Sequence, residues 1–74
     1  MWRRYKIKIY RLFHLFPSVL YVDTKDTDME QMSNKIGDAL EANSITFVTY
    51  KGVSKSYDRS SITKIIVEQV KCKN

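Results

Sequence analysis

Residues 3–24 read RRYKIKIYRLFHLFPSVLYVDT, and the pattern within this stretch decides how the chain folds. Its first part, residues 4–9, alternates basic side chains strictly with apolar or aromatic ones. Successive side chains of a β-strand point to opposite faces, so this alternation is typical of a strand with one buried face. The buried face carries Tyr5, Ile7 and Ile9, and the opposite face carries Arg4, Lys6 and Lys8.

The same stretch has the basic start and the apolar run of a targeting or membrane segment. However, its apolar part, residues 10–22, is shorter than the roughly 20 residues that a spanning helix needs, and Arg11 and Pro17 interrupt it. No small-residue cleavage pattern follows, and cleavage would remove two strands from a chain of 74 residues. We therefore expect no transmembrane segment, and we interpret the stretch as a β-hairpin that pairs about residues 3–13 with 18–24.

The acidic middle of the chain predicts one amphipathic helix. Thr27, followed three residues later by Glu30, has the pattern of a capping box. Asn43 suits a left-handed C-cap, so the helix is placed at residues 27–43. Apolar side chains recur along it at helical spacing, namely Met29, Met32, Ile36, Ala39 and Leu40.

Three further strands are predicted after the helix. Residues 45–50 and 53–57 contain β-branched and aromatic side chains and flank a short glycine-containing turn. One helical turn is expected near Asp58, and residues 62–70 form the last strand. The polar residues 71–74 are expected to fray.

The expected order is therefore ββ-α-βββ in a single domain, residues 1–74. The fold class is α+β, a two-layer sandwich of one helix on a mostly antiparallel sheet of four or five strands. Because one helix covers only one face of a sheet, the opposite face should be open. The parts are a hairpin within 1–24, a helix at 27–43, strands within 45–70 and a tail at 71–74.

The residues that could carry chemistry are few. One cysteine and one histidine cannot form a disulfide within the chain or a closed zinc site. Nothing marks His14 as part of a triad with Ser18 and Asp23, and the two glycines form no phosphate loop. We expect a non-enzymatic protein with no cofactor, no metal and no small-molecule substrate. A lone thiol, Cys72, is typical of a reducing compartment, so the cytoplasm is the expected location.

Charge is distributed unevenly along the chain. The net charge is +5, and it divides into +5 over residues 1–22, −4 over 23–43 and +4 over 44–74. The basic side chains of the first strand should lie on the open sheet face, where tyrosines from other strands could join them. The candidate binding residues are Arg3, Arg4, Lys6, Lys8, Tyr10, Tyr21, Tyr50 and Lys55.

Two kinds of partner fit such a face. A small accessory or regulatory protein would use it to bind a larger protein, since tyrosine and arginine are favoured anchors in interfaces. A nucleic-acid binder would use the lysines for phosphates and the tyrosines for stacking on bases. We predict a second surface near the hairpin for a protein partner or a homodimer contact, because exposed apolar patches mark interfaces. Its residues are Trp2, Phe13, Leu15 and Phe16.

Overall fold

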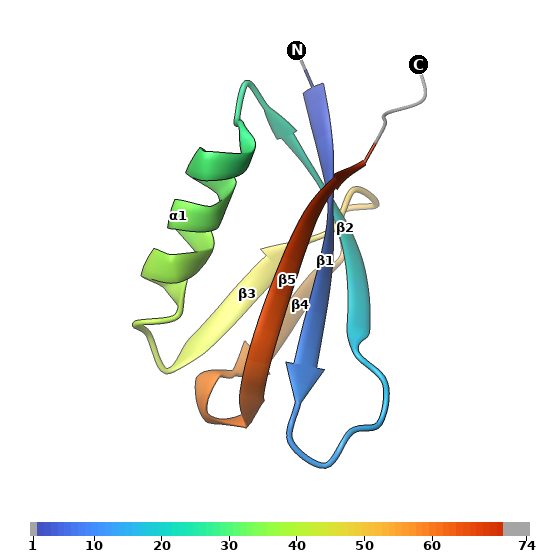
Figure 1. Ribbon diagram of the computed structural model, residues 1–74. Helices are drawn as coiled ribbons and strands as arrows, with labels where there is room; N and C mark the ends of the chain where they lie inside the picture. Colours follow the sequence, from blue (N-terminus) through green and yellow to red (C-terminus); the bar gives the residue numbers. More distant parts are fainter. Residues whose placement is uncertain (1, 71–74) are drawn as a thin grey trace.

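The computed structural model describes residues 2–70, whose elements are shown in Figure 1. They are β1 (Trp2–Arg11), β2 (Ser18–Lys25), α1 (Met29–Ala39), β3 (Ser44–Val48), β4 (Ser54–Asp58), the 3₁₀ helix η1 (Arg59–Ser61) and β5 (Ile62–Val70). This order confirms the predicted ββ-α-βββ arrangement and the α+β fold class. Met1 and the predicted tail 71–74, with Cys72, lie outside the described residues.

The strands form two antiparallel sheets. One has three strands in the order β2-β1-β5, and the other pairs β3 with β4. The N-terminal hairpin has the expected pairing, with Tyr5 opposite Val22 and Ile7 opposite Leu20. The two sheets meet where the Tyr50 N–H donates to the Tyr21 carbonyl at 2.8 Å. The second sheet therefore touches the outer edge of β2.

The core lies on the side of β1 that the alternation predicted. Tyr5, Ile7 and Ile9 are 0% exposed. Residues of every other major element except β4 are buried in the same cluster, namely Leu20, Met32, Ile36, Ile45, Phe47 and Ile62. Each fully buried side chain of this size contributes about 1.5–3 kcal/mol through removal of apolar surface from water. The central strand of the larger sheet thus anchors the helix and both sheets.

Helix α1 begins and ends at residues other than those predicted. Asp28, not Thr27, is the N-cap: its carboxylate accepts from the Gln31 N–H at 2.8 Å, and Gln31 Oε1 accepts from the Asp28 N–H at 3.0 Å. Thr27 is buried instead, and its carbonyl accepts a hydrogen bond from the Tyr5 hydroxyl. The predicted left-handed cap at Asn43 is wrong, because the helix ends at a right-handed Leu40.

The loop between β1 and β2 exposes its apolar side chains. Phe13 has a φ of 63°, in the left-handed region that bulky residues rarely adopt. Phe13, Leu15 and Phe16 are 103%, 93% and 82% exposed. Within residues 2–70, no helix is long and apolar enough to cross a membrane.

Candidate binding surface

The three-stranded sheet has an outer face, which turns away from the core. Because Tyr5, Ile7 and Ile9 point into the core, the alternate side chains of β1 point outward. Lys6 lies between Tyr21 on β2 and Glu68 on β5, its two cross-strand partners. The outer face comprises Arg4, Lys6, Lys8 and Tyr10 of β1, Val19, Tyr21 and Asp23 of β2, and Lys64, Ile66, Glu68 and Val70 of β5.

Arg4 organises one end of the outer face. Its guanidinium makes two hydrogen bonds to Asp23, at 2.7 Å from Nε to Oδ1 and 3.1 Å from Nη2 to Oδ2. The same guanidinium lies 4.4 Å from the ring centroid of Tyr50, in cation–π contact. Tyr50 in turn meets Tyr21 edge to face, with ring centroids 6.5 Å apart. The structure therefore brings together two tyrosines that are 29 residues apart in the sequence.

The arginine also sets the protonation of its partner. The hydrogen bonds and positive charge of Arg4 lower the pKa of Asp23 below its ordinary value, against a smaller opposing effect of burial. Asp23 stays ionised near neutral pH. The pair with Asp23 holds the Arg4 guanidinium beside the Tyr50 ring, because a bidentate contact fixes both the position and the plane of the guanidinium.

Much of the positive charge on and beside this face has no acidic partner among the described residues. Lys8 Nζ lies 3.7 Å from Glu68 Oε1. Four other lysines form no ion pair within residues 2–70, namely Lys6, Lys51, Lys55 and Lys64. Lys51 and Lys64 instead lie 5.6 Å from the ring centroids of Tyr50 and Tyr10, respectively. Lys55 borders a shallow hollow with both Tyr21 and Tyr50. The surface thus combines exposed tyrosines with lysines that are available for an incoming group.

Two of the predicted site residues, Arg3 and Trp2, lie away from the surfaces to which the sequence assigns them. Arg3 takes the same side of β1 as Tyr5, so the alternation places it away from the outer face. Trp2 starts β1, whereas Phe13 and its neighbours follow the end of that strand, so the predicted apolar cluster is not one surface. Only the loop residues Phe13, Leu15 and Phe16 remain close in the chain. The other candidates, from Arg4 to Lys55, lie on the outer face or beside it.

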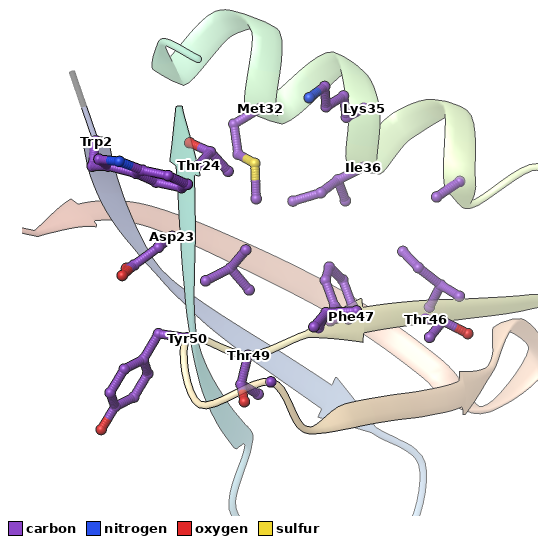
Figure 2. A pocket seen from close by; sticks show the side chains of 15 residues that line it. Trp2, Asp23, Thr24, Met32, Lys35, Ile36, Thr46, Phe47, Thr49 and Tyr50 are labelled. Carbon is purple, nitrogen blue, oxygen red and sulfur yellow. The ribbon is translucent and has the colours of Figure 1, made fainter. Parts of the chain in front are cut away.

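A groove that the sequence did not indicate lies between α1, β2 and β3 (Figure 2). Its volume is about 770 Å³, within the range of about 300–1,000 Å³ for small-molecule sites. Met32 and Ile36 of the helix face Phe47 across it, and Trp2 stands at one end. The size of the groove depends on the distance between α1 and β3, and no local sequence pattern predicts that distance. Apolar groups could be accommodated there, with Lys35 at the helix side.

Comparison of the chain with protein-family models, with curated proteins and with solved structures gives no match in any of the three.

Proposed function

We propose that this protein is a non-enzymatic accessory or regulatory protein that binds a larger protein through its outer face. The observation that carries the proposal is the cluster of Arg4, Tyr21 and Tyr50 beside lysines that form no ion pair within residues 2–70. Aromatic and arginine side chains are the commonest energetic anchors of protein interfaces. Here they are held in place before binding, so less conformational entropy is lost when a partner docks.

The composition of the outer face supports a protein partner over a purely electrostatic one. Val19 and Ile66 place aliphatic side chains among the charged ones, and Val19 is 43% exposed. Asp23 and Glu68 add acidic groups next to the basic ones. Such a mixture resembles the centre and rim of an interface, in which apolar contact provides affinity and charge provides steering. We infer that the partner presents a surface with acidic side chains.

Two double variants of equal charge test this proposal. Lys6→Glu with Lys55→Glu changes the outer face, whereas Lys25→Glu with Lys35→Glu makes the same change in net charge elsewhere. Each tagged protein is used to capture partners from a nuclease-treated lysate of the native cell, after thermal unfolding confirms that it folds. A partner captured by the parent and the control, and reduced at least tenfold with the outer-face variant, supports the proposal. A partner retained equally by both double variants contradicts it.

A second candidate function is direct binding of single-stranded nucleic acid. It is favoured by Tyr21 and Tyr50, 37% and 46% exposed, which lie next to Lys51 and Lys55. Exposed rings can stack on bases while lysines neutralise phosphates. Fluorescence anisotropy with labelled single-stranded oligonucleotides would then show binding at low salt that weakens steeply as salt rises. Absence of binding at 20-fold molar excess of protein in low salt would exclude this function.

A further inference from the structure

We propose that β5 pairs, in antiparallel register, with β5 of a second copy of this chain, about a two-fold axis at Ile66. Within residues 2–70 the strand order of the larger sheet is β2-β1-β5, so β5 is an end strand of that sheet. It has nine residues, Ile62–Val70, although free edges are usually short or blocked. This proposal does not depend on the proposed function, because it concerns pairing along an edge of the sheet and its test is the oligomeric state, not the capture of a partner.

The hydrogen-bonding direction of the β5 backbone follows from the strand pairings. Because the Tyr21 carbonyl bonds to Tyr50, the Tyr21 backbone faces away from β1. Alternate residues in an antiparallel pair exchange hydrogen bonds, so on β1 the backbone groups of Lys6 and Lys8 point toward β5. Their partners Glu68 and Ile66 therefore bond inward. The backbone groups that point from the outer edge of β5 are therefore those of Ile65, Val67 and Gln69, whereas Thr63 stands at the register shift beside Tyr10 and Arg11, where the alternation stops.

A register centred on Ile66 pairs the outward backbone groups of Ile65 and Val67 across the two copies. It places Ile65 opposite Val67 of the second copy, and Thr63 opposite Gln69 of the second copy. By symmetry Ile65 and Val67 form two facing pairs, and each pair can exchange two hydrogen bonds. The half-buried side chains of Ile65 and Val67, which lie on the helix side, would also cover each other. This register gives the longest overlap that the strand allows.

Charge selects the same register. With Ile66 facing its copy, Lys64 lies opposite Glu68 of the second copy, and Glu68 opposite Lys64 of the second copy. Opposite charges that face each other across two strands stabilise the pairing, and like charges destabilise it. A shift of two residues either way places Lys64 or Glu68 opposite Ile66 of the second copy. A shift of four places lysine opposite lysine or glutamate opposite glutamate. The charged side chains therefore specify one pairing, whereas a row of lysines would block all of them.

The expected assembly is a continuous sheet of six strands, in the order β2-β1-β5-β5-β1-β2. The two outer faces would lie on the same side of this sheet, because a two-fold axis perpendicular to a sheet keeps each face together. A partner with two equivalent sites would then bind with increased avidity. The exposed loop between β1 and β2 takes no part in this contact, since it lies at the end of the strands and not along β5.

Two opposite charge reversals test the pairing. Lys64→Glu creates glutamate-to-glutamate contacts in a dimer, and Glu68→Lys creates lysine-to-lysine contacts. Sedimentation velocity of the parent, across a concentration series up to hundreds of micromolar, should show a species of twice the monomer mass. The dimer of each variant alone should dissociate at a concentration at least tenfold higher than the concentration at which the parent dimer dissociates. A mixture of equal parts should restore the dimer, because one chain then carries two glutamates and the other two lysines.

The mixture makes the test independent of any loss of stability in a single variant, since misfolded chains would not recover by mixing. Lys25→Glu, at the far end of β2, is the control of equal charge and should dimerise like the parent. A parent that stays monomeric over the whole concentration range overturns the proposal. So does a dimer that survives both reversals, or a mixture that shows no recovery.

Discussion

At the scale of single residues, the Arg4–Asp23 pair couples the outer face to pH. Its two side chains are 31% and 28% exposed, and two hydrogen bonds join them. Since the pKa of Asp23 is lowered in the folded state, the pair stabilises the fold above the pKa of an unfolded aspartate, about 3.9. That contribution is lost as the pH falls through the lower folded value. A pair this exposed contributes about 1 kcal/mol or less.

We predict that Asp23→Asn destabilises the protein at pH 7 and that the difference from the parent disappears toward pH 2. Urea unfolding at a series of pH values measures this difference directly. In an Arg4→Gln background, Asp23→Asn should show no such pH dependence, because the guanidinium that lowers the pKa of Asp23 has been removed. A difference that stays constant from pH 7 to pH 2 would show that Asp23 acts by some means other than its charge.

At the scale of elements, the sequence predicts that the hairpin and the helix exist, but not the residues at which the helix begins and ends. Thr27 with Glu30 and Asp28 with Gln31 both fit the spacing of a capping box. The choice between them is made by tertiary contacts: Thr27 is buried, and its carbonyl accepts from Tyr5, which lies 22 residues earlier. Local spacing cannot report such a contact. The sequence predicts only that Tyr21 and Tyr50 share one face of the sheet. The contact between their rings depends on how distant strands are placed, which local spacing cannot report either.

We predict that Asp28→Ala lowers the free energy of unfolding by about 1 kcal/mol, since the N–H of Gln31 then loses its acceptor. Glu30→Ala, at the position that the sequence suggested as the reciprocal cap, should cost less, because Glu30 acts only through its charge in the first turn. Chemical denaturation of both variants compares the two positions. A larger cost at Glu30 than at Asp28 would contradict the observed cap.

At the scale of the whole molecule, the two sides of the larger sheet have different roles. The inner side packs against α1 and β3 to form the core, and the outer side displays tyrosines and lysines. Alternation in β1 predicts this division, because a period of two assigns every second side chain to one face. Strand order and the groove beside α1 were beyond such reasoning, since both depend on pairings between distant segments. The outer face is therefore the part of the site that the sequence predicts best.

The most direct test of the outer face as the binding surface is lysine footprinting of the complex with its captured partner. Chemical acetylation rates, read by mass spectrometry, are compared for the free and the bound protein at each lysine. We predict at least fivefold slower modification of Lys6 and Lys55 in the complex, with the rates at Lys25 and Lys35 unchanged. Protection of Lys35 together with unchanged rates at Lys6 and Lys55 would contradict it and would place the partner at the helix side of the molecule.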